Sequence, residues 1–379
     1  MRPLEGITVV SLEQAVAAPF ASRQLADLGA RVIKIERPKV GDFARNYDKS
    51  VNGLSSYFVW INRGKESIEL DLKDEASQKV LEEIIGSADV FLQNLVPGAV
   101  DRLGYAPEKL HEKYPELIIC SISGYGTGGP YEQKKAYDLL IQCEAGLLSV
   151  TGTDEVPSKA GISIADISAG MYAYSGILTA LIAKNRTGKG TILSVSMLEA
   201  LGEWMGNPMY YAAYSNELPK RNGDSHPTIY PYGSFTCGDE KAVFFGIQNE
   251  REWKQFCDHV VEDSSLIDDE RFNNNTNRST NKALLKEIIE DKCKRYTSEE
   301  IILKLNEADI ANARLNTMLD FYNHPQLKAR NRWRTVNTEN GAINALLPPV
   351  TFNNIDYVMG DVPSIGQHNE QIIGDKLKK

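Results

Sequence analysis

Short apolar runs and segments of helical spacing alternate along the first 200 residues of this chain. The apolar runs are rich in β-branched residues, as in buried strands, and cover residues 7–12, 32–36, 89–92 and 117–122. Segments with helical spacing lie between them, and the first of these, residues 17–28, ends at Gly29. This alternation predicts an α/β fold with a parallel sheet covered by helices on both faces.

The sequence changes character near residue 200. Residues 201–224 collect tyrosines, prolines and polar residues, which is typical of a linker. Further on, strand-like runs and then helical segments follow one another at 233–235, 242–245, 250–261, 282–294 and 298–307. We predict a large α/β domain over 1–200 and a smaller α+β domain over 225–324. The tail, residues 325–379, belongs either to the small domain or to the large one.

Composition argues against several classes of function. With 42 Lys and Arg against 51 Asp and Glu, the net charge of −9 disfavours nucleic acid as a partner. The longest uncharged stretch, residues 167–183, is too short for a membrane span, so we expect a buried helix there and no membrane partner. The first residues lack an apolar signal region, and the five cysteines form no metal-ligand pattern. These features predict a cytoplasmic protein without a metal site.

A glycine-rich segment, Gly124–Gly129, fits the pattern G-x-G-x-x-G and follows a predicted strand. This pattern allows a nicotinamide or flavin site and hence an oxidoreductase. The dinucleotide fingerprint, however, belongs on the first strand-to-helix turn, and residues 13–19 contain no glycine there. A loop at the carboxyl end of a strand is the alternative interpretation. The scattered histidines match no hydrolase pattern.

Basic residues gather in the first hundred residues of an otherwise acidic chain. They are Arg31, Lys34, Arg37, Lys39, Arg45, Arg63, Lys65, Lys73 and Arg102. Each is individually typical of a solvated surface, but several at strand and helix ends favour a cradle for a multiply phosphorylated small molecule.

Asp166 interrupts an apolar run just before the long helical segment. We expect it at or beside the helix N-terminus, where the helix dipole and free N–H groups favour its ionised form and apolar neighbours partly desolvate it. The alternative is an N-cap aspartate without a chemical role.

The ordered motifs of the chain resemble those of the class III (family III) CoA-transferases, whose relatives include formyl-CoA and carnitine CoA-transferases and 2-methylacyl-CoA racemases. The resemblance runs through most of the chain. The matching segments are residues 3–7, 25–30, 32–38, 41–42, 62–73, 94–99, 124–126, 136–138, 166–170 and 187–190.

The resemblance implies an enzyme that moves CoA from an acyl-CoA donor to a carboxylic acid acceptor, with Asp166 as covalent nucleophile through an aspartyl anhydride and an aspartyl-CoA thioester. No tightly bound cofactor is implied, since acyl-CoA is a substrate. The implied CoA-binding residues are Ala15, Val16, Ala17, Arg37, Leu70, Lys73, Asn94, Leu95, Ala99, Arg102 and Lys135. For Leu70, Leu95 and Ala99 the alternative is core packing. Tyr137 is implied near the acyl group, while Arg45, Tyr47 and Lys135 suggest a site for the second carboxylate of a dicarboxylate such as succinate.

Two departures from the family patterns narrow these expectations. Racemase members have His-Asp where this chain has Tyr137-Asp138, and tyrosine is a poor substitute in proton exchange, which favours a transferase. The formyl and oxalyl branch has glutamine at the position of Val16, so formate and oxalate are not expected. A racemase-like enzyme and a non-catalytic CoA-binding protein remain the alternatives.

Family architecture implies a large Rossmann-like domain, a smaller α+β domain and ring-shaped subunits that interlock as a homodimer. It also implies that residues 325–379 rejoin the large domain.

Overall fold

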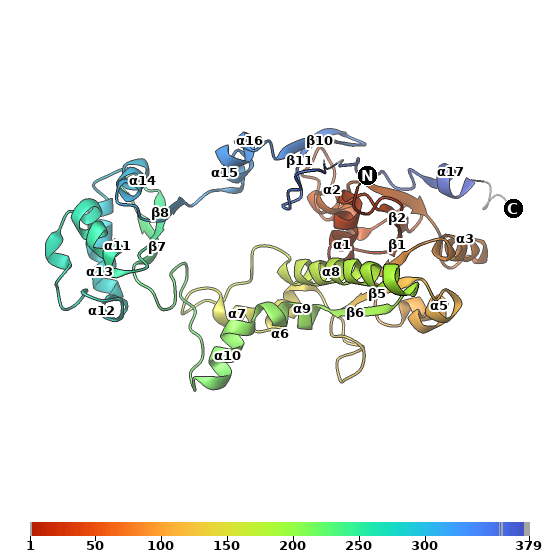
Figure 1. Cartoon of the computed structure of the whole chain (residues 1–379), viewed down its shortest axis with the longest axis horizontal. Coiled ribbons are helices and arrows are strands. Elements are labelled where there is room, and N and C mark those ends of the chain that lie inside the picture. Colours follow the sequence, from red (N-terminus) through yellow and green to blue (C-terminus); the bar gives the residue numbers. More distant parts are fainter. Residues whose placement is uncertain (1, 356, 358, 375–379) are drawn as a thin grey trace. The chain divides into compact units, whose positions relative to one another are not determined.

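A computed structural model describes residues 2–355, 357 and 359–374 of the chain. It divides into two compact units, which are considered separately. The larger unit comprises Met1–Leu147, Ala160–Tyr210 and Leu327–Lys379, and the smaller comprises Leu148–Lys159 and Tyr211–Gln326. Figure 1 shows the elements of both.

A six-stranded parallel sheet forms the centre of the larger unit. Its order is β3-β2-β1-β4-β5-β6, with bounds β1 (Thr8–Leu12), β2 (Arg31–Glu36), β3 (Lys65–Glu69), β4 (Val90–Gln93), β5 (Ile118–Ser123) and β6 (Ile192–Ser196). This sheet confirms the predicted α/β class. The strand order reverses direction between β1 and β4, and in such sheets ligands bind in the crevice at the carboxyl ends of the strands beside this point.

Helices cover both faces of this sheet. On one face α8 (Ile164–Thr187) packs along α1 (Ala17–Asp27) and reaches β5 and β6. On the other, α3 (Glu75–Gly86) and α5 (Pro107–Lys113) join the strands in an apolar core that includes Leu81, Ile85 and Leu110. The remaining elements of this part of the chain are η1 (Phe43–Asn46), α2 (Ser56–Asn62), α4 (Ala99–Arg102), α6 (Asp138–Glu144), α7 (Leu147–Val150), α9 (Met197–Trp204) and α10 (Gly206–Tyr214).

The C-terminal segment packs on the larger unit and covers the edge of β3. The backbone N–H of His368 donates to Ser67 O at 2.9 Å, and the Ser67 N–H donates to His368 Nδ1 at 3.1 Å. The Glu69 N–H donates to Asn369 Oδ1 at 2.8 Å. The elements here are α16 (Pro325–Ala329), the hairpin β10 (Trp333–Thr338) and β11 (Gly341–Leu346), and α17 (Asn369–Ile372).

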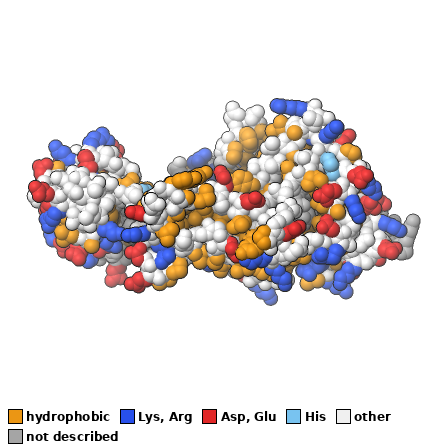
Figure 2. Space-filling model, turned by 90° about the horizontal axis from the view of Figure 1, so that it is seen from below, with side chains coloured by type: hydrophobic (Ala, Val, Ile, Leu, Met, Phe, Trp, Pro, Cys, Tyr) orange, Lys and Arg blue, Asp and Glu red, His pale blue; other side chains and the backbone are white. Residues whose placement is uncertain are grey.

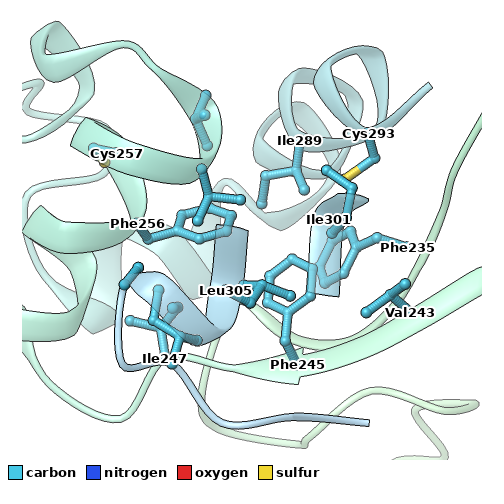
Figure 3. Packing of buried hydrophobic residues seen from close by; sticks show 14 of the residues in the cluster. Phe235, Val243, Phe245, Ile247, Phe256, Cys257, Ile289, Cys293, Ile301 and Leu305 are labelled. Carbon is cyan, nitrogen blue, oxygen red and sulfur yellow. The ribbon is translucent and has the colours of Figure 1, made fainter. Parts of the chain in front are cut away.

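The smaller unit has its own core between an antiparallel sheet and helices. Figure 3 shows Phe235 and Phe245 from the sheet packed with Phe256, Ile301 and Leu305. The strands are β7 (Tyr232–Thr236), β8 (Ala242–Gly246) and β9 (Asn312–Arg314), and the helices are α11 (Glu250–Gln255), η2 (Phe256–Val261), η3 (Ser264–Leu266), α12 (Asn275–Thr280), α13 (Lys282–Cys293), α14 (Ser298–Glu307) and α15 (Met318–Tyr322). The predicted helix over 250–261 continues from α11 into a π-helical turn, η2.

The segment predicted as a linker, residues 201–224, is partly helical. It contains the end of α9 and all of α10. Pro208 lies in the first turn of α10, where its missing N–H breaks no helical hydrogen bond. Within the part of the chain that the structure describes, none of the helices combines the length and the apolar character that a bilayer span requires.

Candidate active site

The first turn of α8 carries Asp166, and another residue caps this turn. Ser163, at the N-cap position, makes no side-chain cap bond. Instead, Asp138 Oδ1 accepts the backbone N–H of Ala165 at 2.8 Å and that of Asp166 at 3.2 Å. The alternative interpretation of Asp166 as an N-cap is therefore wrong, because Asp138 takes that role.

The Asp166 carboxyl group has an environment that disfavours its charge. Burial, and secondarily the negative charge of Asp138, raises the pKa of Asp166 to about 7. Among the described residues none donates a hydrogen bond to this carboxylate. The expectation that free N–H groups would favour its ionised form fails because Asp138 occupies them. Asp166 remains partly accessible to solvent and thus to a substrate.

Gly170 allows α8 to approach α1 closely. A Cβ at this position would lie 2.7 Å from Ala17 O, so a side chain would push the helices apart. Asp166 lies one turn before Gly170, which brings it toward the start of α1 and the predicted Ala15–Ala17 cradle. No described residue accepts the backbone N–H groups of Val16, Ala17 and Ala18, and α1 has no side-chain cap. These three residues are at most 2% exposed, so their N–H groups are unpaired but covered in this structure.

The loop before α1 is held by two side chains. Asn94 makes two hydrogen bonds to the backbone of Gln14. Its Oδ1 accepts the Gln14 N–H at 2.8 Å, and its Nδ2 donates to the Gln14 carbonyl oxygen at 2.9 Å. Asp42 Oδ1 accepts the N–H of Ala15 at 3.0 Å, and Ala15 has φ of 60°, a conformation that costs energy for a residue with a Cβ. Asn94, predicted to contact CoA, thus supports the loop that carries Val16. Val16 and Ala17 are themselves buried, which leaves the partly exposed Ala15 for a ligand.

Below this loop lies a cluster of buried charges, Glu13, Lys34, Asp42 and Lys65, which we call the buried ion cluster. Lys34 Nζ contacts Asp42 Oδ2 at 2.8 Å and Glu13 Oε1 at 3.2 Å, and Lys65 Nζ contacts Glu13 Oε1 at 2.7 Å. Burial opposes the charge of Glu13, but Lys34 and Lys65 outweigh it and lower the pKa of Glu13 to about 2. The assignment of Lys34 and Lys65 to a phosphate cradle is therefore wrong.

The other basic residues divide into paired and free side chains. Arg31 pairs with Glu66, and Arg63 pairs with Asp27. Those exposed without an ion-pair partner among the described residues are Arg37, Lys39, Lys73 and Arg102. Arg37 follows β2, Lys73 follows β3 and Arg102 follows β4, so three of them extend from the carboxyl edge of the sheet. Their role as phosphate ligands stays a prediction.

Arg45 is not free to bind a substrate carboxylate. Its Nε and Nη2 donate to the two oxygens of Glu36 at 2.9 and 2.6 Å, and its guanidinium lies 3.6 Å from the ring centre of Phe58. Burial opposes the charge of Glu36, but the hydrogen bond from Arg45 and the charge of Lys34 lower the pKa of Glu36 to about 2. The structure therefore speaks against the substrate role predicted for Arg45.

Three predicted contacts are apolar and differ in availability. Leu70 is 1% exposed and belongs to the core, so its side chain cannot meet a ligand. Leu95 packs partly buried against the same core, and Ala99 begins α4 partly exposed. Lys135 is exposed in the segment after β5.

Aromatic side chains border Asp166. Burial, followed by the negative charges of Asp42 and Asp166, raises the pKa of Tyr47 to about 12. Tyr137 also contributes to the raised pKa of Tyr47. It is 68% exposed and lies at the N-cap position of α6. Tyr47 meets Tyr57 edge to face, with ring centres 5.3 Å apart. Tyr57 was missed from the sequence, since no spacing pattern distinguishes it from Phe58 or Trp60.

The glycine-rich segment leaves β5, the fifth strand, and not the first. Gly126, Gly128 and Gly129 have φ of 86°, 82° and 82°, which favour glycine. A Cβ at Gly124 would collide with Ala136, so the segment folds back on itself. In the part of the chain that the structure describes, no group of three or more His, Cys, Asp or Glu residues is arranged to hold a metal ion.

The strand order, the free cations at the carboxyl edge of the sheet and an unpaired carboxylate nearby are typical of α/β enzymes that act on phosphorylated substrates. The sequence pattern of CoA-transferase family III matches residues 4–369. The chain belongs to this family and is a CoA-transferase.

Relatives and a solved structure agree with this assignment. The chain is 35% identical to acetyl-CoA:oxalate CoA-transferase from Acetobacter aceti, over 87% of this chain and 85% of the relative. It is 30% identical to succinyl-CoA:glutarate CoA-transferase from Homo sapiens, over 100% of this chain and 87% of the relative. The crystal structure of a CAIB/BAIF family protein from Brucella suis matches with a TM-score of 0.89 and 32% identity, covering 99% of both chains.

Replacement of Asp166 by asparagine is expected to stabilise the fold in a pH-dependent way. The unfolded chain loses this proton near pH 3.8 and the folded chain only near pH 7, so the parent protein loses stability as the pH rises between these values. The variant lacks this loss. Its gain in melting temperature over the parent should grow from pH 4 to pH 7 and then level off. An equal gain at pH 4 and pH 8 would show that the charge of Asp166 is not the cause.

Proposed function

We propose that this CoA-transferase works through Asp166 as a covalent nucleophile that carries first the donor acyl group and then CoA. The observation that carries the proposal is the unpaired, partly buried Asp166 carboxylate, with its raised pKa, one turn before the glycine at which α8 packs against α1. A structural aspartate would be expected to have donors of its own.

The steps balance without a net proton. An Asp166 oxygen attacks the thioester carbon of the donor, the carbon–sulfur bond breaks, and CoA thiolate leaves an acyl-aspartyl anhydride. The thiolate attacks the Asp166 carbonyl carbon and expels the donor carboxylate, which leaves an aspartyl-CoA thioester. The acceptor carboxylate attacks this thioester and releases the thiolate, which then attacks the acceptor's acyl carbon. New acyl-CoA and free Asp166 result.

The difficult step is expulsion of a thiolate by a less basic carboxylate. The environment of Asp166 reduces this mismatch, because a shift of pKa from 3.8 to about 7 corresponds to at most about 4 kcal/mol against the charged carboxylate. That figure is a ceiling, since part of the side chain still meets water.

The nucleotide end of CoA is proposed to bind Arg37, Lys73 and Arg102. All three are exposed and without an ion-pair partner among the described residues, and they follow adjacent or nearby strands at one edge of the sheet. Phosphates favour such cations, and binding energy gained far from the thioester offsets the strain of forming the anhydride. Ala15, which is partly exposed, would then face the thioester arm.

A dicarboxylic acid is the proposed acceptor. The relatives are named for acids such as glutarate and oxalate. Oxalate was not expected, because this chain has Val16 where the formyl and oxalyl branch has glutamine, but the named relative makes it an acid to be tested. With Arg45 paired to Glu36, the exposed Lys135 and the hydroxyl groups of Tyr47 and Tyr57 are the groups proposed for the second carboxylate. Tyr137, where racemases have histidine, favours transfer over racemisation.

A homodimer also remains a prediction, as does the cytoplasmic location. Large apolar side chains are exposed on α10, namely Met209, Tyr210, Tyr211 and Tyr214, and on α15, namely Met318, Leu319 and Phe321. Such exposure is typical of surfaces that a partner covers. On the face shown in Figure 2, charges of both signs are interspersed and no extended basic surface stands out.

Exchange of labelled acid into CoA thioester tests the proposed reaction. Incubation with succinyl-CoA and labelled succinate, and likewise with glutaryl- and oxalyl-CoA and their acids, should label at least one thioester without a second acid present. A non-catalytic CoA-binding protein would bind the thioesters and label none. A racemase-like enzyme would instead exchange the α-proton of 2-methylacyl-CoA with solvent.

A further inference from the structure

We propose that Asp138 is a positioning residue for this reaction, which fixes the first turn of α8 through the backbone of the nucleophile and places a negative charge opposite the Asp166 carboxylate. The inference rests on the proposed role of Asp166. It adds a second carboxylate, which does not touch substrate and acts through the first.

The contacts of Asp138 join two helices. Its Oδ1 accepts both the Ala165 and the Asp166 N–H, at 2.8 and 3.2 Å, which are the bonds that an N-cap side chain ordinarily makes within its own helix. Asp138 is itself the first residue of α6, 28 positions away from Asp166 in the sequence. The residue at the N-cap position is already a serine, Ser163, yet its side chain makes no cap bond. The cap supplied from α6 therefore couples the nucleophile to that helix.

Gln142 fixes the orientation of Asp138. It is fully buried one turn along α6, and its Nε2 donates to Asp138 Oδ2 at 2.6 Å. Its Oε1 accepts the N–H of Ala160 at 2.9 Å, which ties down the segment that leads into α8. Both oxygens of Asp138 thus have donors, whereas no described residue donates to the Asp166 carboxylate. The two carboxylates therefore differ: hydrogen bonds stabilise the charge of Asp138, and no described residue stabilises that of Asp166 in this way.

The charges around α8 identify Asp138 as the partner that matters. The elements packed against α8 are α1, α6, α9, β5 and β6. Their charged residues are Arg23 and Asp27 on α1, Asp138 and Glu144 on α6, and Glu199 and Glu203 on α9. Arg23 and Asp27 pair with each other, and Glu144 pairs with Lys134. Beyond burial, Asp138 is the charge that raises the pKa of Asp166.

The repulsion between the two carboxylates favours the attack of Asp166 on the thioester. When Asp166 attacks, its negative charge passes to the departing thiolate and the repulsion from Asp138 is relieved. While Asp166 carries an acyl group or CoA it is neutral, and the cap from Asp138 still holds the turn. The second carboxylate therefore raises the basicity of the nucleophile without changing its position.

The test separates the charge from the cap. In a rapid-quench single turnover with the active acyl-CoA, intact protein mass gives the rate of covalent loading between pH 5 and pH 9. For the parent enzyme this rate should rise with pH around 7. Asp138→Asn keeps an oxygen for the two N–H groups and removes the charge, together with the acceptor for Gln142 Nε2, so its midpoint should move to lower pH and its plateau should fall. Glu112→Gln, an exposed acid on α5 outside the site, is the matched control and should behave as the parent.

Hydrogen exchange of residues 160–170 provides a second readout that needs no activity. Asp138→Ala removes the cap and should speed exchange in this segment more than Asp138→Asn does, since the asparagine keeps the cap and loses the bond from Gln142. An unchanged midpoint in Asp138→Asn, or unchanged exchange in Asp138→Ala, overturns the inference. If instead the parent enzyme turns over without covalent loading, the proposed role of Asp166 fails, and exchange in Asp138→Ala still decides the role of the cap.

Discussion

Asp166→Ala is expected to lower CoA transfer by at least about 10⁴-fold, the scale on which loss of a covalent nucleophile acts. Both the anhydride and the aspartyl-CoA thioester are built on this side chain, so no other step in the proposed sequence can replace it. The fall should appear in kcat rather than in acyl-CoA affinity, because the proposed CoA ligands lie elsewhere. Steady-state exchange and equilibrium binding of CoA give the two quantities separately.

Folding controls make that result interpretable. The alanine variant should melt at least as high as the parent near pH 8, since it removes a charge that burial disfavours. Glu112→Gln should keep parental activity. Residual transfer above about 0.01 per cent of the parent rate in a folded Asp166→Ala protein would contradict the covalent role.

Lys34→Met is expected to destabilise the larger unit by about 3–5 kcal/mol, which is the usual cost of removing one partner from a buried ion pair. Lys34 is fully buried between Asp42 and Glu13, and its loss leaves two carboxylates with Lys65 alone. Asp42 in turn holds the N–H of Ala15 in its strained conformation. We therefore expect a higher KM for acyl-CoA together with the loss of stability, measured by urea unfolding and by initial rates.

Lys79→Met supplies the matched control for that variant. Lys79 is exposed on α3 and lacks an ion-pair partner among the described residues, so its replacement should change the free energy of unfolding by less than about 0.5 kcal/mol. Equal stability of the Lys34 and Lys79 variants would show that the buried ion cluster contributes nothing to the fold.

Much of the fold follows from hydrophobic periodicity. The predicted strands at 7–12, 32–36, 89–92 and 117–122 correspond to β1, β2, β4 and β5, and the uncharged stretch 167–183 lies in α8. Strand β3, with the sequence KESIE, was missed, because its polar residues are buried by specific partners. Lys65 belongs to the buried ion cluster, and Ser67 donates to Glu36 and receives the backbone N–H of Gly366. Hydrophobic periodicity and strand propensity do not reveal such pairing of polar side chains.

Candidate site residues could be predicted where the residue type and its local sequence indicate a role. They could not be predicted where the role depends on contacts with residues elsewhere in the sequence. An isolated carboxylate in an apolar run indicated Asp166. Its cap by Asp138 joins residues 28 positions apart, and the pairing of Arg45 with Glu36 depends on how the chain turns after β2. The list of basic residues therefore contained both exposed side chains, such as Arg37, and buried structural charges, such as Lys34.

Trapping with hydroxylamine during turnover tests the central claim most directly. Hydroxylamine attacks an activated acyl carbon, so an aspartyl anhydride or thioester becomes a hydroxamate that peptide mass spectrometry locates. The account predicts an acyl-CoA-dependent hydroxamate at Asp166, absent from Asp166→Asn. An unmodified Asp166 in enzyme that continues to transfer CoA under the same conditions would contradict it.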